Sequence, residues 1–315
     1  MSWLRRGSAG RSAVAGLLVL CFLGSLGSLR TDLLPNVTPN LLPPLERQVV
    51  PFGLLALAST LFAWVRGTEW PRGRQVLDWV LVGLGLFVVP ALLIAFSKVW
   101  VTDLTRVALF SLAPVFAVVL EPYIGSGNGK QARGGLLATL VAVGGTLCIF
   151  PVDLPHSIMA GSAFCAVILA AVCVTAANCR AVMTATESAG NSSMPMAAIA
   201  GATAAVGLAA ASALTERGSW KWVGLTPELA WTAAVELPAL LLLFWLMRRM
   251  SAVRMMTRFL LAPLIAILIG MALLRPTVGL RTWIGLLLVA AGAGWLVFAR
   301  EDEPEASTLP LQLHR

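Results

Sequence analysis

The strongest chemical candidate in the sequence is Glu236, a carboxylate inside an apolar run that continues through Pro238. If that run begins near residue 228, Glu236 lies about 12 Å along a helix, well inside the hydrocarbon layer of a bilayer. A carboxylate at this depth is costly, and such residues usually face an interior cavity where they relay protons or pair with a substrate. The structural alternative is a carboxyl group bonded to a carbonyl freed beside the proline. We favour the functional interpretation and predict that Glu236 lies on a substrate or proton pathway.

Three more polar residues lie in a second apolar run, over 102–122. Asp103 and Arg106 are one helical turn apart and should form an i, i+3 pair near one end of a helix, with Ser111 as a polar lining residue further in. Arg106 could bind a ligand, or its guanidinium could reach the membrane interface while its stem remains in the apolar layer. Both explanations stay open. We add Asp103, Arg106 and Ser111 to the predicted pathway.

The residue types needed for metal or acid-base chemistry are scarce. Histidine occurs only at His156 and His314, and the five cysteines form no CxxC pair. The loop Gly125 to Lys130 superficially resembles a phosphate-binding loop, but Gln131 stands where a Ser or Thr is required. We therefore expect no catalytic residues, no metal ligands and no cofactor.

Four prolines fall inside apolar runs, namely Pro90, Pro114, Pro238 and Pro263. They occur in pairs, because Leu112-Ala113-Pro114 returns as Leu261-Ala262-Pro263 after 149 positions, and Pro90-Ala91-Leu92 returns as Pro238-Ala239-Leu240 after 148. This spacing indicates one unit written twice. A proline removes a backbone donor and disturbs the carbonyl one turn earlier. We predict that all four kink their helices and line a central cavity, where the freed carbonyls are tolerated.

The composition predicts the fold class. Of the 315 residues 58% are hydrophobic and only 12% charged, which leaves too little polar surface for a water-soluble globule. Because about 20 apolar residues cross a bilayer as a helix, we predict an all-α polytopic membrane protein with ten transmembrane helices. They are expected near residues 13–29, 47–66, 76–97, 102–122, 134–151, 158–178, 195–214, 228–247, 255–274 and 281–299.

The duplication divides the chain into a five-helix repeat over 1–151, a second over 152–300 and a cytoplasmic tail over 301–315. Five crossings reverse the starting side, so the second copy should insert upside down and give two inverted repeats. The run over 13–29 follows several arginines and also fits a signal peptide. We favour a retained helix, because another apolar run lies 148 positions later.

The basic residues predict the orientation. With a cytoplasmic N-terminus, the inner segments hold about twice as many Lys and Arg residues as the outer ones, as the positive-inside rule requires. Both termini are then cytoplasmic. The net charge of +8 is scattered between the apolar runs and forms no single basic face, so we expect no nucleic-acid partner.

With ten spans, a five-plus-five repeat and the segment Arg106-Val107-Ala108-Leu109-Phe110-Ser111-Leu112-Ala113-Pro114-Val115-Phe116, the chain resembles the drug/metabolite transporter superfamily, specifically its EamA type. The resemblance covers nearly the whole chain. It implies an exporter or exchanger of small metabolites, with a cavity lined largely by the third, fourth, eighth and ninth helices. One family feature departs: the Gly-Glu that often follows the fourth and ninth helices is absent, with Glu121-Pro122 displaced and Arg275-Pro276 in its place.

We therefore expect a secondary transporter, not an enzyme, that moves a small polar metabolite such as an amino acid by alternating access, as export or exchange. Its partners would be that substrate and membrane lipid, and the architecture allows a homodimer. The abundance of arginine, alanine and glycine suggests a bacterial inner membrane. The alternatives are an intramembrane lipid-modifying enzyme, which would need a polar constellation, and a non-transporting scaffold, which would leave the paired prolines and Glu236 unexplained.

Overall fold

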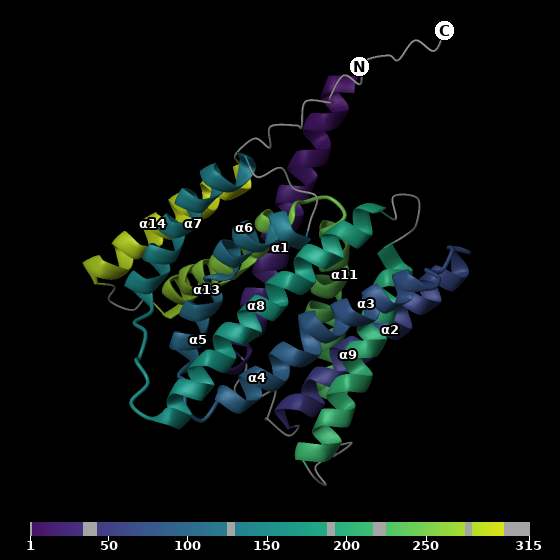
Figure 1. The fold of residues 1–315 in the computed structure, drawn as a ribbon, viewed down its shortest axis with the longest axis horizontal. Coiled ribbons are helices and arrows are strands. Elements are labelled where there is room, and N and C mark those ends of the chain that lie inside the picture. Colours follow the sequence, from purple (N-terminus) through teal and green to yellow (C-terminus); the bar gives the residue numbers. More distant parts are fainter. Residues whose placement is uncertain are drawn as a thin grey trace.

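The fold is known from a computed structural model that describes residues 2–33, 43–124, 130–187, 193–216, 225–274 and 279–298. Every regular element in these ranges is helical (Figure 1). In chain order they are α1 (Ser2–Leu33), α2 (Pro44–Val65), α3 (Arg74–Gly83), η1 (Leu84–Val88), α4 (Val89–Ser97), α5 (Asp103–Phe110), α6 (Ala113–Ile124), α7 (Lys130–Ile149), α8 (Ile158–Glu187), α9 (Ser193–Thr215), α10 (Leu225–Trp231), η3 (Thr232–Glu236), α11 (Leu237–Met247), α12 (Ala252–Met256), α13 (Arg258–Leu274) and α14 (Leu280–Phe298).

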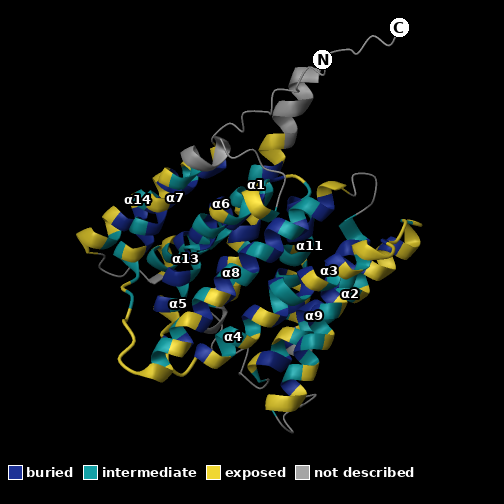
Figure 2. Cartoon of the chain, viewed as in Figure 1, coloured by how far each residue is buried: buried dark blue, intermediate teal, exposed yellow. Residues whose placement is uncertain are grey.

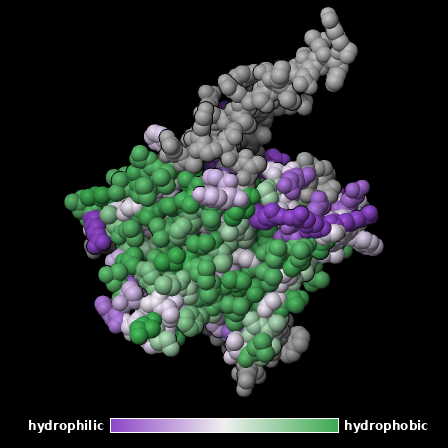
Figure 3. All heavy atoms as spheres, viewed as in Figure 1, coloured by the Kyte–Doolittle hydropathy of each residue, from purple (hydrophilic) through white to green (hydrophobic). Residues whose placement is uncertain are grey.

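Length and composition make this a polytopic membrane protein. Among the described residues nine helical stretches are long and apolar enough to cross a bilayer, and the apolar part of α7, Gly135–Ile149, is shorter. In lipid a helix is stable because it satisfies its own backbone hydrogen bonds. Hydrophobic side chains cover most of the face in Figure 3, with hydrophilic ones near its edges. Exposed leucines such as Leu57, Leu137 and Leu287 would face lipid there.

The predicted helices are found within a few residues of their expected positions, with two clear extensions. α1 begins at Ser2, well before residue 13. α8 continues to Glu187, well past residue 178, so Arg180 belongs to a helix and not to a loop. α1 packs against α11 and α13 in the bundle, with Leu17 and Cys21 buried. The first apolar run is thus part of the core.

Two π-helical turns interrupt the bundle, and each one directly precedes a proline. In η1 the Val89 N–H donates to the Leu84 carbonyl, five residues back. In η3 the Leu237 N–H donates to the Thr232 carbonyl in the same way. The next residue is proline in both cases, and a proline ring clashes with the carbonyl four residues before it. Widening the preceding turn by one residue relieves that clash, so the distortion lies ahead of the proline.

The other two prolines differ from each other. α5 ends at Phe110 and α6 begins at Ala113, so Pro114 lies in the first turn of α6, where no internal hydrogen bond is lost. Pro263 lies inside α13, and the break in that span comes earlier, at Thr257 between α12 and α13. The irregular turns therefore fall at different distances from the four prolines.

α8 crosses the middle of the bundle, while α7 and α14 lie side by side at one flank and α2, α3 and α9 at the other (Figure 1). Buried residues follow the inner faces of these helices and exposed ones their outer faces (Figure 2). Glycines allow the closest contacts: a Cβ on Gly145 would lie 2.7 Å from the Gly285 carbonyl oxygen, and one on Gly292 would lie 2.5 Å from that of Ala138. The α7–α14 pair is thus held backbone to backbone.

Candidate functional site

Glu236 is the last residue of η3 and is half-buried. One of its carboxylate oxygens accepts a hydrogen bond from the Thr232 hydroxyl at 3.0 Å, across the widened turn. Thr232 itself is fully buried. η3 packs against α1 and α2, so this carboxylate belongs to the region where the first two spans meet the eighth.

The corresponding position in η1, Val88, has an apolar role. Its methyl groups occupy the space beside Gly207 of α9, where a Cβ would lie 2.8 Å from one of them. The two π turns thus have the same backbone conformation but different side chains at their last position. Only the second carries a titratable group.

The two helices that carry a Leu-Ala-Pro segment, α6 and α13, each make a contact with the first span of the other half. The two contacts match. Ser25 of α1 donates its hydroxyl to the carbonyl of Ala262, which precedes Pro263, at 2.8 Å. Thr175 of α8 donates to the carbonyl of Ala113, which precedes Pro114, at 3.4 Å. Each hydroxyl also lies within 2.8 Å of the carbonyl four residues back in its own helix. The two contacts tie α1 to α13 and α8 to α6.

The other residues of the predicted pathway are not brought to Glu236. Asp103 and Arg106 do form the expected ion pair, at the start of α5. Ser111 is fully buried and donates to the Ala108 carbonyl of its own helix at 2.6 Å. Of the four prolines, Pro90 and Pro114 are buried, Pro263 is half-buried and Pro238 is exposed.

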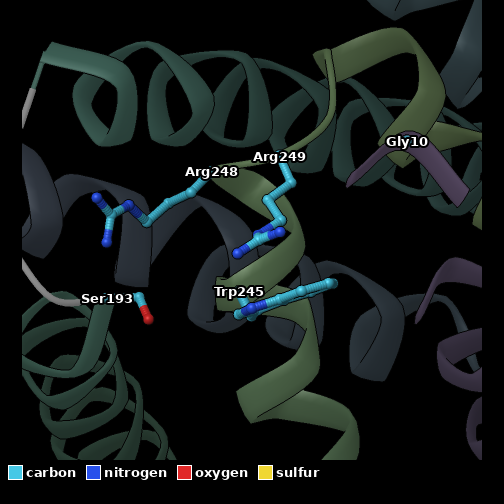
Figure 4. A pocket seen from close by; sticks show the side chains of 5 residues that line it. All are labelled: Gly10, Ser193, Trp245, Arg248 and Arg249. Atoms are coloured by element: carbon cyan, nitrogen blue, oxygen red, sulfur yellow. The ribbon is translucent and has the colours of Figure 1, made fainter. Parts of the chain in front are cut away.

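A cavity of about 500 Å³ opens at the end of the bundle where α11 finishes, and none of the predicted site residues lines it. Its walls come from α1, α9 and α11 and consist of Gly10, Ser193, Trp245, Arg248 and Arg249 (Figure 4). The guanidinium of Arg249 lies over the Trp245 ring, 4.5 Å from its centre. This cavity is basic, and its lining comes from α1 near the start of the chain and from α9 and α11 in its later part.

Sequence reasoning missed two contacts that join distant helices. Arg180 of α8 donates to the buried carboxylate of Asp78 in α3 at 2.7 Å, which joins the third span to the sixth. Glu216, at the end of α9, accepts hydrogen bonds from the backbone N–H groups of Leu45 and Glu46 at 2.9 and 3.1 Å. The start of α2 at Pro43-Pro44 offers no side-chain cap of its own. In the sequence, the only indication of the Glu216 contact was that α2 begins at Pro43-Pro44 without a capping side chain of its own. The free N–H groups of such a helix start need an acceptor from elsewhere in the protein.

Within the described residues no three His, Cys, Asp or Glu side chains form a group that could hold a metal ion.

No family model matches the sequence, and no curated protein matches it. A solved crystal structure, described only as that of a protein, is similar in fold: the TM-score is 0.71 over 92% of this chain and 99% of the other, at 16% identity. At this identity the similarity shows the fold alone. The helical arrangement described above therefore also occurs in an experimentally determined structure.

Proposed function

We propose that this chain is a secondary transporter of the drug/metabolite transporter superfamily, EamA type. It moves a small polar metabolite, an amino acid or a similar compound, across the membrane by alternating access, as export or exchange. Its ten spans form two inverted five-helix repeats over residues 1–151 and 152–300, followed by a tail over 301–315. Both termini lie in the cytoplasm, and the membrane is the bacterial inner membrane.

The observation that carries this proposal is the pair of hydroxyl contacts from Ser25 to Ala262 and from Thr175 to Ala113. The donors lie in the first span of each half, and the acceptors are the residues before Pro263 and Pro114 in the fourth span of the other half. A reciprocal contact of this kind is what a pseudo-twofold relation between inverted repeats produces.

Further contacts support the same relation. Phe110 and Phe259 occupy equivalent positions of the two halves, and their rings pack together with centroids 5.5 Å apart, as residues near a twofold axis would. α2 packs on α9 and α7 packs on α14, which are also equivalent helices. In transporters with inverted repeats, substrates bind near the midplane at the interface of the repeats. The basic cavity beside Trp245 then serves as one entrance to that interface.

Counterflow in liposomes tests the proposal. Purified protein is reconstituted into vesicles preloaded with one unlabelled metabolite from a panel of amino acids and related compounds. For at least one panel member, we expect the labelled substrate to accumulate transiently in the vesicles against its own concentration gradient. The measurement is made with and without a pH gradient. Protein-free vesicles provide the control. A folded, inserted protein that exchanges no member of the panel would contradict the transport function.

A further inference from the structure

Arg258 is the first residue of α13 and lies inside the bundle. Its guanidinium carbon is 4.9 Å from the centre of the Phe259 ring. That ring packs on Phe110 of α5, and α13 also packs against α1, whose Cys21 is buried. Residues of α1, α5 and α13 thus meet around this cation, beside the aromatic pair at the proposed twofold axis.

The guanidinium lacks an anionic partner. Its Nη1 is shut off from solvent, and no hydrogen-bond acceptor reaches it in the part of the chain that the structure describes. None of the ion pairs found there includes Arg258. By contrast, Arg106 of α5 is paired with Asp103, and Arg180 of α8 is paired with Asp78. A guanidinium nitrogen that is buried without an acceptor is costly, so this feature calls for a function.

The end of the bundle that carries the cavity is basic. Arg248 and Arg249 line the cavity beside Gly10 of α1, and Cys21 lies about 16 Å further along the same helix at 1.5 Å per residue. At the far end the carboxylates of Glu216 and Glu228 lie near the start of α2. An anion would therefore be drawn to the basic entrance and would meet Arg258 deeper along α1.

We propose that Arg258 binds an oxyanion of the transported substrate, a carboxylate or a phosphate. The inference rests on the transport function proposed above. A guanidinium forms two parallel hydrogen bonds with either group, and the match is strongest away from water. In the substrate-free protein the cation rests against the Phe259 ring, and the incoming anion supplies the missing acceptor.

Thermal unfolding of the purified full-length protein in detergent tests the site. The probes are free amino acids, the same amino acids as C-terminal amides, and inorganic phosphate. We expect free acids or phosphate to raise the Tm and the amides to leave it unchanged. A shift by acids alone identifies a carboxylate, and a shift by phosphate alone identifies a phosphate. Equal shifts by acids and amides, or no shift by any anion, would overturn the proposal.

Variants separate binding from folding. Arg258→Gln should weaken binding of the active anion about tenfold or more, Arg258→Lys should weaken it less, and the exposed Arg281→Gln should not change it. Without ligand, Arg258→Met should keep or raise the Tm, because it removes an unpaired buried charge. A lower Tm in Arg258→Met, or full anion binding by Arg258→Gln, would assign Arg258 a structural role and reject the site.

Counterflow with the same probes separates this inference from the proposed function. Acid-specific binding without any counterflow would contradict the transport function and leave the anion site standing. Counterflow of acids and amides at equal rates, unchanged in Arg258→Gln, would support transport and contradict the anion site.

Discussion

At the scale of single residues, the proposals depend on two charged side chains inside the bundle, Glu236 and Arg258. Glu236 keeps a short contact with Thr232 across a π turn, where the backbone is already irregular. A carboxyl group in such a place can hold or release a proton with little rearrangement of its neighbours. The equivalent Val88 cannot, so any proton coupling would depend on the second half alone.

Replacing Glu236 by Gln tests this role, because Gln keeps the shape and the bond to Thr232 and removes titration. We expect transport by Glu236→Gln to lose its response to a proton gradient or to fail, while expression and Tm remain close to those of the wild type. The measurement is liposome counterflow across a range of pH. Glu187→Gln, at the exposed end of α8, is the control. If the pH profile of transport by Glu236→Gln matches that of the wild type, Glu236 has only a packing role and the prediction is wrong.

The hydroxyls of Ser25 and Thr175 should contribute equally, because their surroundings are equivalent. We expect Ser25→Ala and Thr175→Val each to lower the free energy of unfolding by about 1 kcal/mol, the usual size of an interhelical hydrogen bond in a membrane. Thr146→Val is the matched control, since the Thr146 hydroxyl bonds only to the Ala142 carbonyl of its own helix. Denaturant titration in micelles gives the values. A loss in only one of the two variants would contradict their equivalence.

At the scale of elements, hydrophobic run length predicted the helices, and two of the four prolines, Pro90 and Pro238, marked the irregular turns that precede them. The form of the deviation was not predictable, because a π turn and a simple kink differ by a small energy that tertiary contacts decide. The ion pair of Asp78 and Arg180 was missed for another reason: its partners are 102 positions apart, and a span of 20 residues ended the predicted helix before Arg180. Asp103 with Arg106 was predictable because both lie on one helical turn.

The close contact between α7 and α14 gives a prediction whose control variants are at nearby glycines of the same two helices. Gly145→Ala and Gly292→Ala place a methyl group against the partner backbone, so each should lower the free energy of unfolding by about 1–3 kcal/mol. Gly144→Ala and Gly294→Ala meet nothing within 4 Å and should be neutral or slightly stabilising. Thermal unfolding in detergent measures all four. Equal effects at Gly144 and Gly145 would mean that α7 and α14 pack through other faces.

At the scale of the whole molecule, the sequence predicted an all-helical membrane bundle, and the structure confirms this for the described residues. The site was less predictable. The cavity beside Trp245 and the surroundings of Arg258 depend on helices from both halves, and a single sequence does not show which faces meet. The five-plus-five inverted arrangement remains a prediction, supported by the offset of the prolines and by the reciprocal hydroxyl contacts.

Topology reporters test that arrangement. A fusion after Lys98 and a fusion after Arg249 end in equivalent loops of the two repeats, and inversion requires those loops to lie on opposite sides of the membrane. We expect a periplasmic signal after Lys98 and a cytoplasmic one after Arg249, in agreement with the excess of arginine in the second loop. Signals from the same side at both points would rule out inverted repeats.

The two π turns also bear on the ancestry of the chain. A π turn contains one residue more than the α-helical turn it replaces, so a one-residue insertion is one way to produce it. Here both turns occupy the same place in their halves, 148 positions apart. On the proposed duplication, a single insertion before the gene was doubled accounts for both, whereas later events would have had to strike the same site twice. On that account the irregular turn in the third helix of the repeat is older than the doubling.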